Sequence, residues 1–244
     1  MFKNIFARIW AFWGLLTFAF TFLLAFPFAM IAYAMEEKKG QIYFTKVSRV
    51  WMSTWLFLIG CTVHISGRSN FIKGRNYIVL FNHNALLDVP LSSPFVPGSN
   101  KTIAKASFSK VPVFGLYYSL GSVLVDRKDE KSRAKSFDKM LDVLSKGMHM
   151  SIYPEGTRNR SSEPLKSFYD GAFRLAKSSG KEIIPCIIKG TKEAMPASKT
   201  FYLLPAKLSL QFLPAISPVD LSVQELKDKV YNIMLKAYTS NYKS

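Results

Sequence analysis

The sequence contains little histidine, little cysteine and few acidic residues. Its 244 residues include three His, two Cys and 16 Asp and Glu against 33 Lys and Arg, a formal charge of +17. Cys61 and Cys186 form no C-x-x-C pair, which argues against a disulfide framework or a zinc site. The absence of a G-x-S-x-G sequence disfavours an ordinary lipase. No cluster of metal-ligand residues stands out, so we expect no metal ion.

Long polar tracts and internal repeats are also missing. Because 49% of the residues are hydrophobic and 14% aromatic, the chain should fold around a core rather than stay disordered. The excess of positive charge favours anionic partners: nucleic acid, anionic lipid or an acidic carrier protein. The apolar N-terminus favours lipid among these, since basic residues beside a membrane anchor attract anionic headgroups.

The N-terminal region reads as a membrane anchor. No charged residue occurs from Ile9 to Met35. A helix of that length would measure about 40 Å, more than the roughly 30 Å of a bilayer's hydrocarbon core. Pro27 is expected to kink or end this helix. Lys3, Arg8 and Ala32-Tyr33-Ala34 also resemble parts of a signal peptide, but the apolar run is longer than a usual signal sequence, so we favour an anchor.

A second apolar stretch runs from Val50 to Val63 and is too short to span a bilayer comfortably. The segment before it is basic, with Lys38, Lys39, Lys46 and Arg49. If both stretches crossed the membrane, this basic segment would be placed outside, against the positive-inside tendency. We therefore expect two helices that dip into one leaflet, with both ends and the loop on the cytoplasmic side.

The chain after Gly67 alternates short apolar runs with helical patterns. Strands are predicted at residues 77–81, 122–125, 150–153, 183–188 and 208–212. One helix is indicated by the spacing of Ala134, Phe137, Leu141 and Leu144. Another should begin after Ser222, which with Glu225 forms a capping-box pattern. We predict an α/β domain at residues 67–244 with a mixed, largely parallel sheet flanked by helices, preceded by two anchoring helices at residues 1–66.

His83 is the strongest candidate for acid–base chemistry. It follows the predicted strand at 77–81, and polar residues at the carboxyl end of a strand commonly form the sites of α/β proteins. An imidazole can act as a general base near neutral pH, and it needs an acceptor that fixes its tautomer. Asp88 is the nearest carboxylate. Residues five apart lie about 140° apart around a helix, so the two can meet only if His83 precedes the helix or lies in its distorted first turn.

Two further segments could bind an anion. In Tyr153-Pro154-Glu155-Gly156-Thr157-Arg158, Gly156 permits a tight turn, Thr157 can donate a hydrogen bond and Arg158 offers a planar fork that suits phosphate. An ordinary turn with solvated charges is an equally good interpretation of this segment alone. The second segment runs from Lys105 to Arg127, and its residues taken singly are weak indications.

Together these segments resemble the glycerolipid acyltransferase family that includes 1-acylglycerol-3-phosphate acyltransferases. The similarity covers most of residues 65 to 200, and its blocks occur in the family's order: Asn82, His83 and Asp88; Lys105 to Pro112 with Gly115, Gly121 and Arg127; Tyr153 to Arg158; and Ile183 to Ile188. The family commonly has Gln-Ser after the histidine, where this chain has Asn84-Ala85.

The resemblance implies a reaction without a covalent acyl-enzyme. His83 would be the general base and Asp88 its partner, with acceptor phosphate bound at Lys105, Arg127, Glu155, Gly156, Thr157 and Arg158. The substrates would be lysophosphatidate in the bilayer and an acyl thioester of acyl carrier protein or coenzyme A, giving phosphatidate. No other cofactor and no nucleic acid is expected. The enzyme would lie at the inner membrane with its catalytic domain on the cytoplasmic side.

Other functions remain open at the level of sequence. The acceptor could be glycerol 3-phosphate, another lysophospholipid or an aminolipid. A thioester hydrolase would need no acceptor. A non-catalytic basic membrane scaffold or nucleic-acid-binding protein would account for the charge and the anchor, but not for the ordered blocks around His83.

Overall fold

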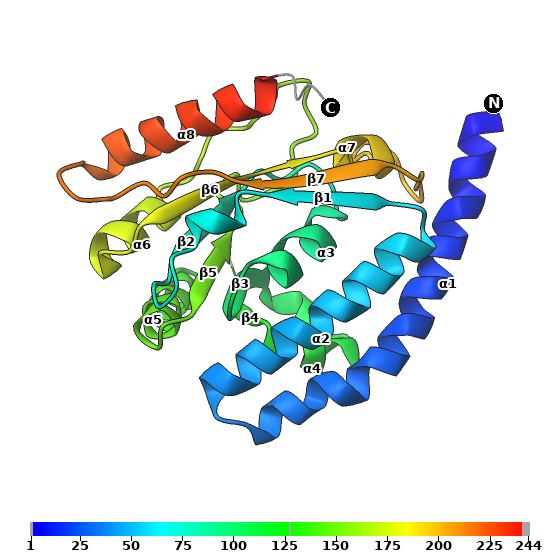
Figure 1. Ribbon diagram of the computed structural model, residues 1–244, viewed down its shortest axis with the longest axis horizontal. Helices are drawn as coiled ribbons and strands as arrows, with labels where there is room; N and C mark the ends of the chain where they lie inside the picture. The colour runs from blue at the N-terminus through cyan, green and yellow to red at the C-terminus, as the bar shows by residue number, and fades with distance from the viewer. Residues whose placement is uncertain (1, 127, 241–244) are drawn as a thin grey trace.

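The computed structural model describes residues 2–126 and 128–240 and contains a seven-stranded sheet between two layers of helices (Figure 1). The strand order is β1-β7-β6-β2-β5-β3-β4. All neighbouring pairs are parallel except β6–β7, which confirms the predicted mixed, largely parallel sheet. The strands are β1 (Thr62–Ser66), β2 (Ile78–Phe81), β3 (Asn100–Lys105), β4 (Ser122–Val125), β5 (His149–Ile152), β6 (Ile183–Lys189) and β7 (Lys207–Phe212).

Strand β2, at the centre of the sheet, is apolar throughout because both faces of the sheet are covered there. Side chains alternate between the faces of a strand. Val79 and Phe81 of β2 therefore pack on the side of α1 (Phe2–Met30), α2 (Glu37–Leu58) and α3 (Asp88–Ser92). Ile78 and Leu80 pack on the side of α5 (Glu130–Ser145), α6 (Gly171–Ser179) and α8 (Val223–Thr239).

The remaining elements are short. They are η1 (Ile31–Ala34), η2 (Arg68–Asn70), η3 (Ser93–Phe95), η4 (Ala106–Lys110), α4 (Phe114–Leu120) and α7 (Thr191–Ala194). The predicted start of the last helix is confirmed, because the Ser222 hydroxyl accepts from the Glu225 N–H while the Glu225 carboxylate accepts from the Ser222 N–H. These reciprocal bonds satisfy two N–H groups that a helix start otherwise leaves unpaired.

The two N-terminal helices pack through a seam of small residues. Ala7, Ala11, Gly14, Thr17 and Thr21 recur at three and four along α1 and are its main buried positions. Large side chains of α2 fill the space that these residues leave. The indole N–H of Trp55 donates to the Gly14 carbonyl at 2.9 Å, and that of Trp51 donates to the Thr21 hydroxyl at 3.0 Å. The seam thus joins α1 to the same core as the sheet.

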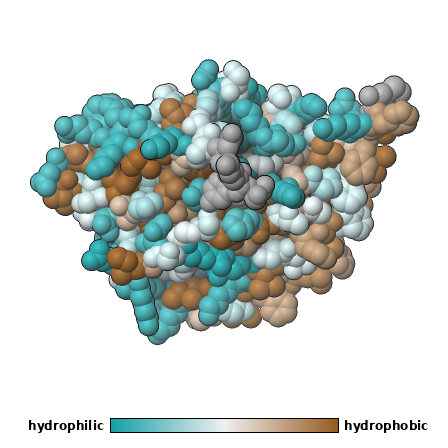
Figure 2. Space-filling view, turned by 45° about the horizontal axis from the view of Figure 1, so that its top comes forward, coloured by the Kyte–Doolittle hydropathy of each residue, from teal (hydrophilic) through white to brown (hydrophobic). Residues whose placement is uncertain are grey.

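The outer face of α1 is apolar and exposed. Among the described residues, one helical segment, Phe2–Ala34, is long and apolar enough to cross a membrane. Phe20 and Leu23 are each 64% exposed. Figure 2 shows hydrophobic surface gathered toward the side on which α1 runs. This surface indicates membrane association. Pro27 does not end the helix, which continues for three more residues to Met30.

The predicted second apolar helix differs from the structure in extent. α2 begins at Glu37 and ends at Leu58, and its inner face is buried, so it is not a second apolar span. Residues 62–66, which the predicted division placed in the anchor, form strand β1 and pair in parallel with β7. The sheet therefore starts before residue 67. A half-exposed edge strand with a histidine at its centre carries too weak an apolar pattern to separate it from the preceding helix.

Candidate active site

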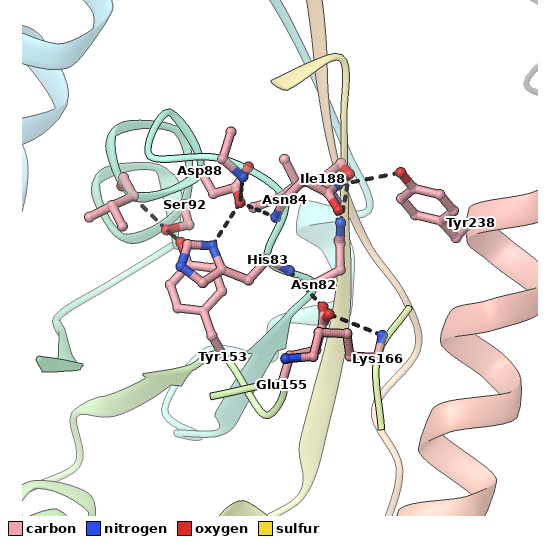
Figure 3. A network of polar contacts seen from close by, with 12 residues as sticks. Asn82, His83, Asn84, Asp88, Ser92, Tyr153, Glu155, Lys166, Ile188 and Tyr238 are labelled. Atoms are coloured by element: carbon pink, nitrogen blue, oxygen red, sulfur yellow. Dashed lines mark hydrogen bonds and ion pairs between the residues drawn. The ribbon is translucent and has the colours of Figure 1, made fainter. Parts of the chain in front are cut away.

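The loop between β2 and α3 carries the central residues of the site (Figure 3). Asn82, the first residue after β2, is fully buried and bridges to β6. Its amide Nδ2 donates to the Ile188 carbonyl at 2.9 Å, and its Oδ1 accepts from the Ile188 N–H at 2.7 Å. These two bonds continue the β2–β6 pairing beyond the strand, so the chain leaves the sheet in a fixed direction.

His83 and Asp88 meet in this loop. The His83 Nδ1 lies 2.8 Å from Asp88 Oδ2. The same oxygen accepts the backbone N–H groups of Asn84 at 2.5 Å and Ala85 at 2.8 Å. The contact that the five-residue spacing predicted is present because α3 begins at Asp88 and His83 precedes it. Asp88 is completely buried, whereas 16% of the His83 side chain stays exposed.

Tyr153 packs against the imidazole. The ring centroids of His83 and Tyr153 are 4.3 Å apart at an interplanar angle of 32°. The Tyr153 hydroxyl lies 2.6 Å from the Ser92 hydroxyl on α3, and burial raises the pKa of this tyrosine well above 10. The tyrosine therefore stays a neutral phenol, and its ring limits how far the histidine can turn.

The backbone of His83 is held from the segment that follows β5. Glu155 Oε1 accepts the His83 N–H at 2.7 Å and Oε2 accepts the Lys166 N–H at 3.1 Å, while the Asn159 N–H donates to the His83 carbonyl at 2.7 Å. Glu155 is 1% exposed, and this burial raises the pKa of its carboxyl group. A carboxylate in this position fixes the loop and does not face the cavity.

A cavity of about 1290 Å³ opens beside His83. One part of its wall is apolar and comes largely from α1, α2 and α4, with Phe18, Trp51, Met52, Trp55, Phe114 and Tyr117. The part near the histidine is cationic and polar, with Lys105, Lys128, Gly156, Thr157, Arg158, Arg160 and Lys166. The arrangement can hold a long apolar chain and an anionic group at once, with an imidazole beside both.

Comparison with known proteins decides the family. Residues 62–189, slightly more than half of the chain, match the profile of the family described as Acyltransferase. The chain belongs to the acyltransferase family. The matched range begins at β1 and ends with β6, so it contains the histidine loop and the segment after β5.

Curated relatives of this acyltransferase-family chain carry consistent names. A 1-acyl-sn-glycerol-3-phosphate acyltransferase of Chlamydomonas reinhardtii is 29% identical over 84% of this chain and 63% of its own length. Proteins of the same name from Borreliella burgdorferi and Saccharomyces cerevisiae are each 31% identical, over 56% and 59% of this chain. The chain spans 63%, 54% and 48% of the length of these three relatives.

A solved structure shares the fold of the acyltransferase-family chain. It is the crystal structure of the 1-acyl-sn-glycerophosphate (LPA) acyltransferase PlsC from Thermotoga maritima, with a TM-score of 0.81 and 22% identity. The similarity covers all of this chain and 99% of the other. The two-helix start and the mixed sheet therefore belong to one common architecture.

The cavity brings together most of the residues that the sequence singled out. His83, Lys105, Gly156, Thr157 and Arg158 line it. Asp88 stands behind His83, and Arg127 lies outside the described residues. The predicted phosphate contact of Glu155 is wrong in this geometry, because both carboxylate oxygens face backbone N–H groups inside the protein.

Other residues of the acyltransferase site were missed from the sequence. Lys166 lines the cavity and donates through Nζ to the Thr157 hydroxyl at 2.8 Å. The only signal for it was its place in the segment after the third block. Among the described residues, no group of three or more His, Cys, Asp or Glu side chains is placed to hold a metal ion.

Proposed function

We propose that this protein transfers a fatty acyl group from an acyl thioester to the sn-2 hydroxyl of 1-acylglycerol 3-phosphate and so forms phosphatidate. One observation carries the proposal: the Asp88-bound imidazole of His83 lies in a cavity that is apolar on one side and cationic on the other. The names of the relatives support the same acceptor. A lysophosphatidate has the matching parts, namely one acyl chain, one free hydroxyl and a phosphate.

His83 acts as the base in this proposal. The Asp88 oxygen already accepts two backbone N–H groups, and it also accepts a hydrogen bond from His83, whose proton is therefore on Nδ1. Nε2 then keeps its lone pair and can remove the proton of the acceptor hydroxyl. The hydroxyl oxygen attacks the thioester carbonyl, the C–O bond forms, the C–S bond breaks, and the proton passes from the imidazolium to the departing thiolate.

No protein nucleophile takes part. Both cysteines are buried, burial raises the pKa of each thiol, and neither lines the cavity. Neither thiol can therefore serve as the nucleophile, and in this proposal the acyl group passes directly from the thioester to the acceptor. Much of the rate comes from holding the two substrates together in the cavity.

The phosphate of the acceptor binds at the cationic part of the cavity. Arg158 offers a bidentate fork, and Gly156 and Thr157 lie beside it on the same turn. Gly156 has a φ of +69°, a conformation that favours glycine. Lys105 and Lys166 add positive charge. Glu155 positions the loop rather than binding the phosphate.

The donor is acyl carrier protein or coenzyme A carrying the acyl group, and no further cofactor takes part. Both donors are anionic, which suits the formal charge of +17. The protein acts at the inner membrane with its catalytic domain on the cytoplasmic side, where both thioesters occur. The acceptor keeps its acyl chain in the leaflet while its headgroup reaches His83.

The reaction is tested with purified protein in detergent and a labelled acyl thioester, with and without 1-acylglycerol 3-phosphate. We expect phosphatidate only when the acceptor is present, and none with His83→Ala. Free fatty acid released without acceptor would instead identify a hydrolase. Product from glycerol 3-phosphate but not from the lysolipid would contradict the proposed acceptor.

The phosphate site is tested with Arg158→Ala beside Arg75→Ala. Arg75 pairs with Glu182 at the surface and does not line the cavity, so it is a matched control. We expect Arg158→Ala to raise KM for the phosphate-bearing acceptor and to leave transfer to a neutral monoacylglycerol unaffected. Equal loss on both acceptors would contradict a phosphate contact.

A further inference from the structure

The segment formed by η4 and α4 exposes apolar side chains outside the cavity. Val111 is 43% exposed, Val113 46% and Leu116 56%, and none of these three lines the cavity. Other residues of the same segment, such as Phe114 and Tyr117, line the cavity. The segment, residues 106–120, is therefore a thin wall with the cavity on one side and an unpartnered apolar surface on the other. We call this outer surface the α4 face.

A strained turn maintains the α4 face. Val113 has φ +63° and ψ −57°, and the Phe114 N–H donates to the Pro112 carbonyl at 2.6 Å. This is a γ-turn of the rare positive-φ kind, which is unfavourable for a β-branched residue. The next turn is equally tight, since a Cβ on Gly115 would lie 2.1 Å from the Ser109 carbonyl oxygen. The chain thus holds an unfavourable conformation that leaves valine side chains outside.

The α4 face continues the exposed apolar surface of α1. Phe22 of α1 contacts the rings of Phe114 and Tyr117, each at 5.7 Å between centroids. The Tyr33 hydroxyl donates to the Leu116 carbonyl at 3.0 Å. Figure 1 shows α4 beside the half of α1 that leads into α2. The neighbouring part of α1 exposes Phe20, Leu23, Leu24 and Phe28, and η1 exposes Ile31.

The charges around the α4 face have one sign. Residues 100–120 contain three lysines and no Asp or Glu. Lys110 is exposed beside the α4 face, whereas Lys105 also lines the cavity and Lys101 pairs with Glu37. Lysines beside an apolar surface suit the boundary between acyl chains and anionic headgroups, because their stems can stay in the apolar layer while their amines reach the headgroups. An acidic protein would match Lys110 but not the exposed valines and leucine that follow it.

We propose that the α4 face is a second lipid-binding surface, which inserts into the same leaflet as α1. The cavity wall formed by residues 106–120 then lies in the leaflet, and the cavity opens toward the acyl chains. The proposed lipid contact does not depend on the proposed reaction. Only one consequence, that the acceptor enters the cavity sideways from the leaflet, rests on the proposed function.

Site-directed spin labelling tests the proposal on the full chain in vesicles of phosphatidylcholine and phosphatidylglycerol. Leu116→Cys and Val111→Cys carry the nitroxide, and Val219→Cys is the control. Val219 is 64% exposed and lies between β7 and α8, a segment on the opposite side of the molecule from α1 in Figure 1. The native cysteines can stay, because both are buried and burial raises the pKa of each thiol.

We expect oxygen to relax the labels at 111 and 116 more than a water-soluble nickel complex does, with the reverse order at 219. A label at 116 that remains open to the nickel complex in vesicles would overturn the proposal. Spin–spin broadening between labels at 116 of two molecules would overturn it as well, because it would assign the surface to a second copy of the chain. Neither readout depends on acyl transfer, so failure of the lipid contact and failure of the reaction are distinguishable.

Discussion

In the proposed mechanism, the contact of Asp88 with Nδ1 determines which nitrogen of His83 acts as the base. Replacing it by asparagine keeps the size of the side chain but removes the charge and allows the amide to donate to Nδ1, which then leaves the proton on Nε2. We expect Asp88→Asn to lower kcat by about 10³- to 10⁴-fold, as the loss of a triad carboxylate does elsewhere, with little change in KM. Steady-state kinetics at saturating donor measures kcat, and a decrease in kcat smaller than tenfold would contradict the proposed role of Asp88.

The ring of Tyr153 packs on His83, whereas its hydroxyl contributes a hydrogen bond to the stability of the fold. Tyr153→Phe keeps the ring on His83 but loses the hydrogen bond to Ser92. We expect it to cost about 1 kcal/mol of unfolding free energy and to change kcat little. Ser92→Ala is the matched variant. Because both remove the same bond, the double variant should be barely less stable than either single one, and additive losses in denaturant titrations would refute the pairing.

His149 gives the fold a defined response to acid. Burial, with a contribution from the charge of Lys38, lowers the pKa of this β5 histidine to about 4. Its Nδ1 accepts the Tyr77 N–H at 3.0 Å, a bond that protonation destroys. The unfolded chain binds this proton near pH 6.5 and the folded chain only near 4. The contribution of His149 to the free energy of unfolding is therefore full above pH 6.5 and falls with decreasing pH by about 1.4 kcal/mol per pH unit.

Unfolding curves between pH 4.5 and 7.5 measure this response. We expect the acid-side slope to decrease in His149→Gln, because the neutral amide has no proton to take up. His64→Gln, a change at an exposed histidine on β1, is the control. An unchanged slope in His149→Gln would assign the acid sensitivity to other groups.

At the scale of elements, the packing of α1 on the core depends on the small size of its buried residues. A Cβ on Gly14 would lie 2.6 Å from Leu203 Cδ2, in the segment before β7, and 3.5 Å from Ile59 Cγ2 at the end of α2. We expect Gly14→Val to overpack this contact and to lower the unfolding free energy by about 1–3 kcal/mol. Gly171→Ala is the control, since a Cβ there has no neighbour within 4 Å. Thermal unfolding in detergent compares the two, and equal melting temperatures would contradict the close packing.

The elements that sequence could predict are those with a strong local pattern. The run 183–188 is apolar because it is buried, and 208–212 alternates buried apolar with half-buried polar residues; they appear as β6 and β7. β1 and β3 were not predicted, since β1 is a half-exposed edge and β3 includes Lys101, which pairs with Glu37, and Lys105, which lines the cavity. Their identity as strands depends on pairing partners far along the chain.

The same distinction holds for the site. The His83–Asp88 contact could be predicted because both residues lie in one loop. The positions of Glu155 and Ser92 could not, because their contacts join residues 72 and 61 positions apart. A carboxylate beside a candidate phosphate loop looks like part of the site in sequence, and only the backbone N–H groups that it accepts show that it is internal.

At the scale of the whole molecule, α1 is both a membrane-associated helix and a part of the core. Trp51 and Trp55 donate to α1, and Trp10 of α1 donates to the Ile59 carbonyl at 2.9 Å. We expect deletion of residues 2–34 to expose these aromatic side chains and to give aggregated protein rather than a soluble enzyme. Size-exclusion chromatography and circular dichroism check this, and a monodisperse protein with a cooperative melt would show that the anchor is separable.

The hydrogen bonds that Glu155 and Asn159 form with the backbone of His83 limit which residues can change when acceptor preference changes among related enzymes. The loop of His83 and the segment that carries Arg158 form one hydrogen-bonded unit, so we expect a change in that segment to shift the histidine as well. New acceptor preferences should therefore arise at Lys105, Lys128 and Lys166, which border the cavity from other segments. We therefore expect acceptor preference to change through substitutions at these margins, while the hydrogen-bonded loops around His83 keep their geometry.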